Sequence, residues 1–500
     1  MKRLFFFILH SSLVMSLSAQ QSTLGLFRGN TEVGDPKIKG SVVYNSSTQE
    51  YTMEGSGINM WANSDQFNFL WKKIKGDFMM TATVRFIGKG VNEHRKIGII
   101  ARNDLNADSK YADACVHGSM LTSLQYRDTV GGETKQVQLS PDHPTTDIML
   151  ERKGNLFTFS AAAFGENYSA VSKEIPLNDE VYAGLFICSH DATVKEKAVF
   201  SNVRIIIPPA VGYQPYKDFI GSHLEVMDVA SGARKILMTV PNSIQAPNWT
   251  RDGKYLVYNS SAGLLYKYDL KSGSVSGLNT GIAKNNNNDH VISFDGKMLG
   301  ISNHVGEKRI STIFTLPITG SDRPTQITRE TEHSYFHTWS PDGKKLIFTG
   351  QRNGVFDIYS IDIATRKETK LTDNPTLDDG PEYTPDGNWI YFNSVRTGTM
   401  QIWRMKPDGT GQEQITSDEF NNWFPHISPD GKWIVYIAFP KDINPSDHPF
   451  YQNVYLRLMP VAGGVAKTIA YLFGGQGTIN VPSWSPDSKK IAFVSNTDDK

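Results

Sequence analysis

The sequence has few cysteines. Cys115 and Cys188 are the two in 500 residues, and both lie in strand-like runs of the first half. They do not show the paired-thiolate spacing of a metal site. Two interpretations stay open: the thiols form a disulfide in an oxidising compartment, or both remain reduced and buried.

Net charge and basic clusters are lacking as well. Lys and Arg number 51, Asp and Glu number 51, and the formal net charge at pH 7 is +0. Proteins that bind nucleic acid ordinarily carry a basic patch or stripe, so the sequence predicts no nucleic-acid partner. No stretch beyond the N-terminus approaches the roughly 18 uninterrupted apolar residues of a membrane helix. We therefore expect no membrane span in the mature chain.

The first residues read as a targeting segment rather than as part of the fold. A basic start, Met1–Arg3, precedes the mostly apolar run Leu4–Leu17, and small residues near Ala19 suit cleavage. We therefore expect residues 1–19 to be a signal peptide and the mature protein to be exported, either to the periplasm or out of the cell. Because no cysteine follows the cleavage site, a lipid anchor is not expected there.

What the sequence does contain is a hairpin motif repeated six times in its second half. Its clearest copy, Phe336–Thr349, has Ser-Pro-Asp-Gly between two strand-like runs, and this tetrapeptide suits a tight turn. The turn aspartates at 252, 295, 342, 386, 430 and 487 are 43, 47, 44, 44 and 57 residues apart. A period in the forties is typical of four-stranded propeller blades. We expect these aspartates to cap their own turns, and Trp249, Trp339 and Trp484 to pack between blades.

Two incomplete units flank the complete repeats. The strand-like segments 223–228 and 233–237 lack an inner hairpin, whereas the last repeat, ending at 491–495, lacks outer strands. Together they supply one shared blade, which would close a ring of six and remove exposed sheet edges. The segments Trp484–Ser495 and Asp357–Asp362 resemble the repeats of TolB-like propellers. This resemblance implies a six-bladed β-propeller over residues 221–500, a fold that serves as binding platform, enzyme or peptidase cover.

Residues 24–207 contain none of these repeats. They alternate strand-like runs with Gly-, Asn- and Asp-rich turns, which predicts a β-sandwich. The pieces Gly98–Asn103, Leu150–Asn155 and Gly184–His190 resemble the concanavalin-like (laminin-G-like) sandwiches that accompany carbohydrate-active domains. The Pro-rich stretch 208–220 reads as a linker. The whole chain is thus predicted to be all-β, with an N-terminal sandwich and a C-terminal propeller.

Each propeller repeat places polar residues before its first strand and after its second. These two ends of the hairpin share one face of the ring, so their side chains are expected to converge at the mouth of the central channel. The sequence therefore predicts a ligand-binding set drawn from several blades: Asn248, Asp289, His304, Arg352, Glu382, Arg396, Trp423 and Gln476.

Histidines of the same repeats are candidate metal ligands. The predicted set is His290, His337 and His426, with Glu382 or Gln476 as the fourth ligand. Such donors suit a divalent ion such as Mn, Ni, Zn or Ca. His426 lies one residue later in its repeat than the other two histidines, and neighbouring strand residues point in opposite directions. Whether His426 joins the other two therefore stays open.

Arg352 and Arg396 could pair with a carboxylate of the substrate, which suits an acidic sugar. A uronate bound to the metal would lose its C5 proton to a basic side chain and undergo β-elimination. The predicted site is similar in plan to that of oligogalacturonate lyases, a propeller family with His and Gln metal ligands at the equivalent mouth.

The sequence thus favours an exported protein that binds a glycan or another small polar ligand at the propeller mouth, with or without help from the sandwich. One alternative is a metal-dependent polysaccharide lyase or glycoside hydrolase that acts on an acidic or modified glycan. Another is an envelope scaffold that binds a protein partner through the mouth. The plainest interpretation is a channel lined by polar groups that bind only water.

Overall fold

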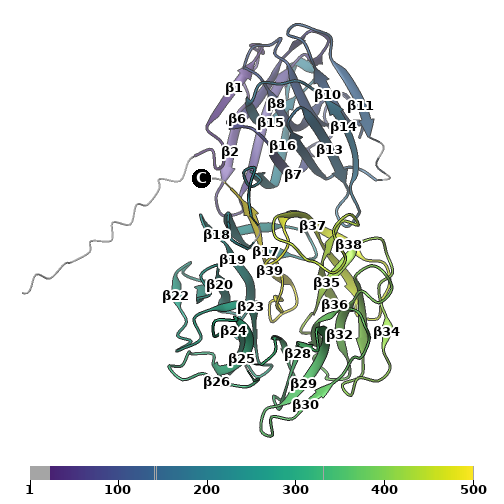
Figure 1. Ribbon diagram of the computed structural model, residues 1–500. Helices are drawn as coiled ribbons and strands as arrows, with labels where there is room; N and C mark the ends of the chain where they lie inside the picture. Colours follow the sequence, from purple (N-terminus) through teal and green to yellow (C-terminus); the bar gives the residue numbers. More distant parts are fainter. Residues whose placement is uncertain (1–22, 140, 142, 215, 330, 499–500) are drawn as a thin grey trace, which may run out of the picture.

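The computed structural model describes residues 23–498 except 140, 142, 215 and 330. The predicted signal peptide, residues 1–19, lies outside the described residues and stays a prediction. The described residues form strands, turns and loops without an α-helix, which confirms the predicted all-β class. That part of the chain accordingly has no helix long and apolar enough to cross a membrane. Figure 1 shows two units, a pair of large sheets above and a ring of small sheets below.

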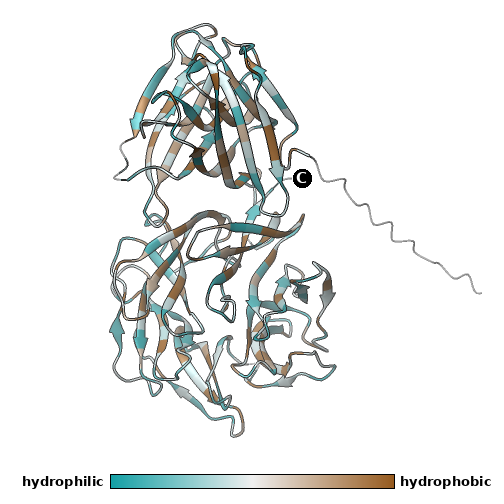
Figure 2. Cartoon of the chain, turned by 180° about the vertical axis from the view of Figure 1, so that it is seen from behind, coloured by the Kyte–Doolittle hydropathy of each residue, from teal (hydrophilic) through white to brown (hydrophobic). Residues whose placement is uncertain are grey.

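The upper unit consists of two seven-stranded antiparallel sheets. One has the order β1 (Gly29–Val33), β6 (Phe67–Lys75), β15 (Glu180–Cys188), β8 (Lys96–Arg102), β9 (Tyr111–His117), β10 (Thr122–Arg127) and β11 (Lys135–Leu139). The other has the order β14 (Ser169–Glu174), β13 (Leu156–Ala162), β12 (Asp147–Lys153), β7 (Phe78–Ile87), β16 (Asp191–Ile206), β3 (Glu50–Gly57) and β2 (Ser41–Asn45). Side chains of both sheets form one apolar core, and Figure 2 shows hydrophobic residues interspersed with polar ones along the strands. This alternation makes the unit a β-sandwich.

A second apolar cluster contains residues that alternate along the strands with those of the main core. It includes Cys115 and Cys188, together with Met60 from the short hairpin of β4 (Met60–Trp61) and β5 (Ser64–Asp65). Both cysteines are buried free thiols, which is one of the two interpretations that the sequence left open. Burial raises the pKa of Cys188 to about 11, so this thiol stays protonated at neutral pH.

The lower unit is a ring of six sheets. Five of them are four-stranded antiparallel blades that follow one another along the chain. Their strands are β19 (Ile244–Trp249), β20 (Tyr255–Ser260), β21 (Leu265–Asp269), β22 (Val275–Gly277); β23 (Asn286–Ile292), β24 (Met298–Val305), β25 (Ile310–Pro317), β26 (Thr325–Gln326); β27 (Ser334–Trp339), β28 (Lys345–Arg352), β29 (Val355–Asp362), β30 (Glu368–Lys370); β31 (Asp378–Tyr383), β32 (Ile390–Ser394), β33 (Gln401–Met405), β34 (Glu413–Gln414); and β35 (Asn421–Ile427), β36 (Trp433–Phe439), β37 (Gln452–Pro460), β38 (Lys467–Gly474).

The sixth blade joins the two ends of the ring. β17 (Gly221–Asp228) pairs with β39 (Lys490–Thr497) on one side and with β18 (Arg234–Val240) on the other. A bridge between Trp484 and Ile491 adds the segment that precedes β39. This pairing confirms the predicted shared blade and the six-bladed propeller.

The six repeated turns share one hydrogen-bond pattern. In each, the Ser or Thr two residues before the turn aspartate donates its hydroxyl to that carboxylate at 2.6–2.7 Å. The aspartates therefore cap their own turns, as predicted. Trp339 and Trp484 donate their indole N–H to backbone carbonyls of the preceding blade, those of Val291 and His426, each at 2.9 Å. Trp249 makes no such hydrogen bond with the described residues but shares an apolar cluster with Leu224 and Val494 of the shared blade. All three tryptophans thus pack between blades, as predicted.

A buried charge cluster joins the sandwich to the propeller. Glu225 of β17 accepts hydrogen bonds from Arg204 of β16 at 2.6 Å and from Arg234 of β18 at 2.8 Å. The Glu225 side chain is fully buried, and both arginines are less than a tenth exposed. Burial raises the pKa of Glu225, but the two guanidinium groups outweigh it and hold that pKa well below its usual range. Glu225 is therefore a charged anchor between the two units.

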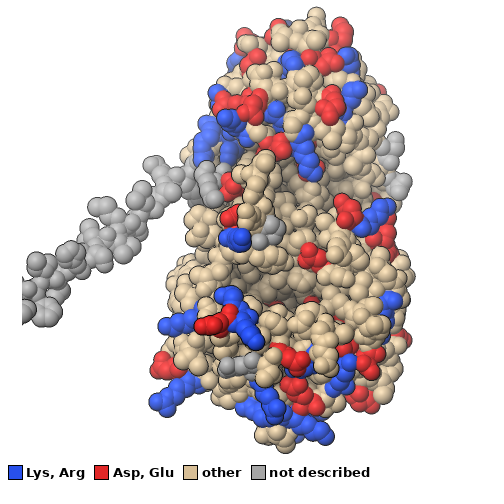
Figure 3. All heavy atoms as spheres, viewed as in Figure 1, with Lys and Arg blue, Asp and Glu red and all other residues tan. Residues whose placement is uncertain are grey.

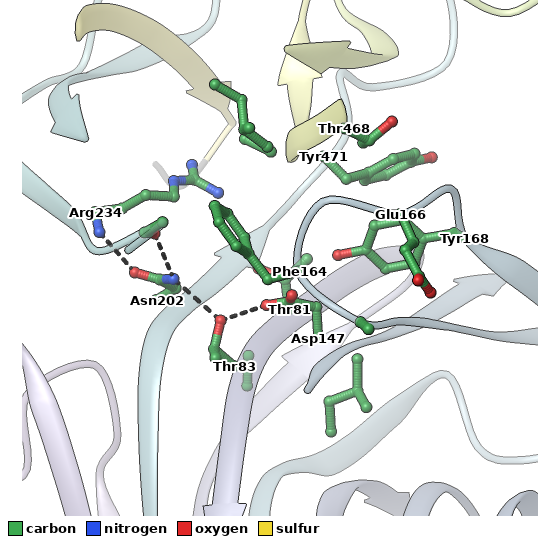
Figure 4. A pocket seen from close by; sticks show the side chains of 16 residues that line it. Thr81, Thr83, Asp147, Phe164, Glu166, Tyr168, Asn202, Arg234, Thr468 and Tyr471 are labelled. Carbon is green, nitrogen blue, oxygen red and sulfur yellow. Dashed lines mark hydrogen bonds between the residues drawn. The ribbon is translucent and has the colours of Figure 1, made fainter. Parts of the chain in front are cut away.

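A chain of hydrogen bonds crosses the same junction beside a small cavity of about 40 Å³ (Figure 4). Asn202 of the sandwich donates to Thr83 and to the carbonyl of Gly232, each at 3.0 Å, and accepts from the backbone N–H of Arg234 at 2.8 Å. Thr83 in turn donates to Asp147 at 2.5 Å. Gly232 and Arg234 belong to the propeller. The Asn202 side chain therefore joins the propeller backbone to the Thr83 side chain of the sandwich.

Candidate functional site

A β-bulge interrupts the first strand of each of the five complete blades. The pairing between first and second strands shifts after Gln245, Asn286, Phe336, Asp379 and Trp423. Bulges leave residues unpaired and re-aim their side chains, and they occur frequently beside functional sites. The unpaired residues here include Asp289, His337 and Phe424.

These bulges surround a cavity of about 610 Å³, and Figure 3 shows a hollow at the centre of the ring. The size lies in the range of small-molecule sites. We call this cavity the mouth pocket. Its lining combines aromatic rings, amides, hydroxyls, histidines and carboxylates, drawn from the blades, from the linker and from the loop between β36 and β37: Tyr216, Phe219, Gln245, Asn259, Ser260, Ser261, Asn286, Asn287, Asn288, Asp289, His304, Arg309, Tyr335, His337, Thr349, Phe356, Leu377, Asp379, Phe424, Ser446, His448, Phe450, Gln476 and Asn480.

Several residues singled out from the sequence line the mouth pocket: Asp289, His304, His337 and Gln476. His304 donates from Nδ1 to the carbonyl of Arg309 at 2.9 Å, and Gln476 accepts from the side chain of Asn480 at 2.9 Å. The ring therefore brings together residues that are distant in the sequence.

The two candidate arginines lie outside the mouth pocket. Arg352 contacts Glu368 at 3.2 Å, and Arg396 contacts the fully buried carboxylate of Asp378 at 2.8 Å. Arg396 also donates to Gln412 at 2.6 Å. Because each guanidinium already has a carboxylate partner, the structure does not support the predicted pairing of these arginines with a substrate carboxylate.

Two further candidates pack inside the propeller instead of lining the mouth pocket. Trp423 is fully buried and lies against His448, with ring centroids 4.5 Å apart. Asn248 donates to the carbonyl of Pro482 and accepts from the backbone N–H of Ile292 at 3.0 Å. Their side chains hold neighbouring segments together, so the structure gives them a packing role.

The three candidate metal ligands do not form one cluster. His337 lies in a bulge and lines the mouth pocket, whereas His290 and His426 are paired in their ladders and buried. Nε2 of His290 lies 3.3 Å from a backbone carbonyl of the neighbouring blade, and His426 is held between Glu382 at 2.6 Å and the Ile479 carbonyl at 2.5 Å. Within the described ranges, no group of three His, Cys, Asp or Glu side chains is arranged to hold a metal ion. The predicted donors, Glu382 included, are thus not brought together as one set of ligands, and a Mn, Ni, Zn or Ca ion stays a prediction.

His337 and Asp379 form the main charge pair of the mouth pocket. His337 Nε2 lies 3.1 Å from Asp379 Oδ1, and the two side chains are 6% and 15% exposed. Asp379 Oδ1 also accepts from the Thr349 hydroxyl at 2.6 Å and from the Gly380 backbone N–H at 2.7 Å. Burial raises the pKa of Asp379, but the contact with His337 outweighs it and leaves that pKa below its usual range. Asp379 is therefore ionised at neutral pH.

Asp289 has the opposite environment. It is 5% exposed, and no Lys, Arg or His nitrogen among the described residues lies within 4.0 Å of its carboxylate. Burial raises the pKa of Asp289 to about 6, with the charge of Asp379 adding to the rise and His337 opposing it. The mouth pocket therefore holds two carboxylates with different proton affinities.

Two other lining residues, Asp379 and His448, are not singled out by the repeat pattern. Asp379 lies in a segment that enters a first strand, but it has no counterpart in the other repeats. His448 comes from the loop between β36 and β37, which accounts for the 57-residue spacing between the last two turn aspartates. Burial lowers the pKa of His448, so its ring is neutral at pH 7. That long spacing is the sequence signal that points to this loop.

Some of the residues that line the mouth pocket carry a buried polar atom without a hydrogen-bond partner. Among the residues that the structure describes, these atoms include Asn259 Oδ1, Asn286 Oδ1, Asn288 Nδ2 and His448 Nδ1. Leaving such an atom unpaired away from water costs about 1–3 kcal/mol. The amides, hydroxyls and imidazoles that line the cavity suit a polar ligand.

The His337–Asp379 pair makes stability depend on pH in a defined direction. Burial lowers the pKa of His337, but Asp379 and Asp289 outweigh it and raise that pKa above its usual value. A raised folded-state pKa stabilises the protein below the unfolded-state value of about 6.5, and the contribution is lost as the pH rises through the folded-state pKa. We expect wild type to exceed His337→Gln in unfolding free energy by more at about pH 6 than at about pH 9, as measured by urea unfolding. An equal difference at both pH values would contradict the pairing.

The ring, its closure and its turns define a six-bladed β-propeller with a polar pocket at its mouth. Residues 307–447 match the family profile PD40, the TolB β-propeller domain. An uncharacterized protein of Agrobacterium fabrum is 46% identical over 274 residues, which are 55% of this chain and 92% of that protein. A solved structure from Agrobacterium tumefaciens that bears the name of TolB is 45% identical, with a TM-score of 0.53 over 56% of this chain and 99% of that one. The chain belongs to the TolB-like β-propeller proteins.

More distant propellers resemble the ring less. An oligogalacturonate lyase from Vibrio parahaemolyticus is 14% identical, with a TM-score of 0.36 over 56% of this chain and 98% of that one. Likeness of this size says nothing about the reaction or the ligand of this chain.

Proposed function

We propose that this protein is exported and binds a small, hydroxyl-rich glycan in the mouth pocket. The observation that carries the proposal is the polar lining of the 610 Å³ cavity, which includes the amide side chains of Asn259 and Asn288. A sugar hydroxyl both donates and accepts hydrogen bonds, so one ligand can satisfy an amide oxygen and an amide N–H alike.

Aromatic rings supply the apolar part of such a site. Phe424 lies against His337 with ring centroids 6.2 Å apart, and Tyr335 lies against Phe356 at 6.3 Å. Phe450 packs on Phe219 at 5.8 Å where the linker meets the loop before β37. Small-molecule pockets ordinarily combine such rings with a few placed polar groups. This mixture suits the apolar faces and polar edges of a sugar.

The charges of the mouth pocket favour a neutral or amino-bearing sugar over a uronic acid. Asp379 is ionised and lies on the lining, so it would repel a substrate carboxylate. Arg309 is the cationic lining residue, and the two arginines first considered for this role face other carboxylates. The ligand class is therefore proposed to be neutral or basic.

Location and domain type complete the proposal. A cleaved signal peptide ending near Ala19 would deliver the mature chain to the periplasm or beyond. The sandwich, proposed to be concanavalin-like, packs against the propeller through Glu225 and Asn202. We propose that it positions the propeller, and that the mouth pocket carries the main binding site.

An oligosaccharide array followed by calorimetry tests this proposal. We expect wild type to bind short neutral or amino-bearing oligosaccharides in preference to uronic-acid oligomers. Asn288→Ala and His448→Ala should each weaken binding about tenfold, because each removes a hydrogen bond worth about 1.4 kcal/mol. The control Asn388→Ala changes an exposed residue in a hairpin turn and should bind like wild type. Failure of folded wild type to bind any sugar on the array would refute the proposal.

A further inference from the structure

We propose that the mouth pocket also hydrolyses glycosidic bonds, with Asp289 as the general acid and Asp379 as the carboxylate that receives the proton of the attacking water. This inference rests on the proposed function, since it requires a glycan in the pocket. It adds a reaction to the binding and assigns the two carboxylates different roles.

The placement of the two carboxylates is the first support. Asp289 projects from the bulge of β23 in the second blade, and Asp379 lies at the start of the bulge of β31 in the fourth. His337 occupies the bulge of β27, in the blade between them. All three side chains line the same 610 Å³ cavity. Three consecutive blades therefore present a carboxylate, an imidazole and a carboxylate to one ligand.

The contacts of Asp379 suit an ionised carboxylate held in place. Thr349, the Gly380 backbone N–H and His337 hold it in place, and all three contact the same oxygen, Oδ1. None of these contacts involves the second oxygen, Oδ2. That oxygen can therefore accept a proton from water, and its charge can stabilise the positive character that develops at the anomeric carbon.

The contacts of Asp289 suit a carboxylic acid that gives its proton away. The Asp289 side chain lies on the lining of the mouth pocket, near the charges of His337 and Asp379. The Asn287 side chain accepts a hydrogen bond from the Asp289 backbone N–H at 3.0 Å. Burial without a cationic contact favours the protonated form. Two carboxylates whose environments separate their proton affinities are the pattern of acid and base roles in one site.

The proposed step balances without a cofactor. Asp289 transfers its proton to the glycosidic oxygen while the bond between that oxygen and the anomeric carbon breaks. Water adds its oxygen to the anomeric carbon and gives one proton to Asp379. The products are two free sugar hydroxyls, and solvent returns the proton from Asp379 to Asp289. His337 is a positioning residue, because it acts by holding Asp379 ionised.

The test compares two kinds of substrate in the full-length mature protein. The probes are short neutral and amino-bearing oligosaccharides, together with their 2,4-dinitrophenyl glycosides, whose leaving group departs without an acid. We expect Asp289→Asn to lose about 100-fold or more in kcat on the oligosaccharides while keeping most activity on the aryl glycosides. Asp379→Asn should lose activity on both. His337→Gln should shift the acidic limb of the pH profile of kcat to higher pH, because the pKa of Asp379 rises when its charged neighbour is removed.

The outcomes separate this inference from the proposed function. Sugar binding by wild type without release of reducing ends at any pH would overturn hydrolysis and leave binding intact. Equal loss on both substrate classes in Asp289→Asn would overturn its role as the acid. Absence of sugar binding would refute both proposals together. Asn388→Ala serves again as the control that should keep full activity.

Discussion

Glu225→Ala is expected to lower the free energy of unfolding by about 3–5 kcal/mol, because it leaves two buried guanidinium groups without their anion. Arg204 and Arg234 both contact this carboxylate, and the Ser495 hydroxyl donates to it at 2.5 Å. The four strands concerned, β16 of the sandwich and β17, β18 and β39 of the propeller, belong to both units. The substitution should therefore weaken the sandwich–propeller junction as well as the shared blade.

Urea unfolding followed by intrinsic fluorescence measures this change. The matched control is Glu180→Ala, which removes a half-exposed glutamate paired with Lys73 at 2.8 Å and should cost less than about 1 kcal/mol. A loss in Glu225→Ala no larger than that of the control would show that the junction does not depend on the cluster. Glu225→Gln, which keeps the shape but not the charge, should fall between wild type and Glu225→Ala.

Asp65→Ala should destabilise the sandwich by a similar amount, about 3–5 kcal/mol. Arg127 contacts both oxygens of Asp65, at 2.7 and 2.8 Å, and Arg102 lies 3.5 Å away. All three side chains are completely buried. Burial lowers the pKa of Arg127, but the Asp65 carboxylate outweighs it and raises that pKa, so the arginine keeps its charge and needs the anion.

The expected readout for Asp65→Ala is a lower urea midpoint with a similar far-UV circular dichroism spectrum. Asp35→Ala is the control, since Asp35 is almost fully exposed and pairs with Lys39 at the surface. Indistinguishable midpoints for the two variants would contradict the role given to Asp65. Double substitution of Asp65 and Arg127 to a well-packed apolar pair should recover part of the loss, because no buried charge then remains between them.

Much of the fold is readable from the sequence because local turn chemistry repeats. The Ser/Thr-x-Asp turns recur at blade spacing, and each aspartate accepts the hydroxyl two residues earlier. Closure of the ring follows from counting strands at the two ends. The arrangement of the sandwich strands is less predictable, since their order in space depends on long-range pairing, such as β15 between β6 and β8.

The site is less predictable because β-bulges decide which side chains reach it. His290 and His337 hold the same position in their repeats, yet the bulge includes only His337. Arginines after the second strands find carboxylates nearby, as Arg396 does with Asp378. His448 enters from a loop outside the repeat. A repeat pattern gives the positions of residues in a blade, but not the local shift in register that turns one residue toward the channel.

The shared blade also sets the order in which this chain can fold. Ser222 and Asn496, partners across β17 and β39, are 274 residues apart. Closing a loop of that length costs about 5 kcal/mol of chain entropy, so the five complete blades, whose contacts are local, should form first. A chain cut short before β39 would keep those blades but expose the edge of β17, which could then pair with another molecule. Ring closure thus distinguishes complete chains from truncated ones, and truncated chains should be recovered as oligomers.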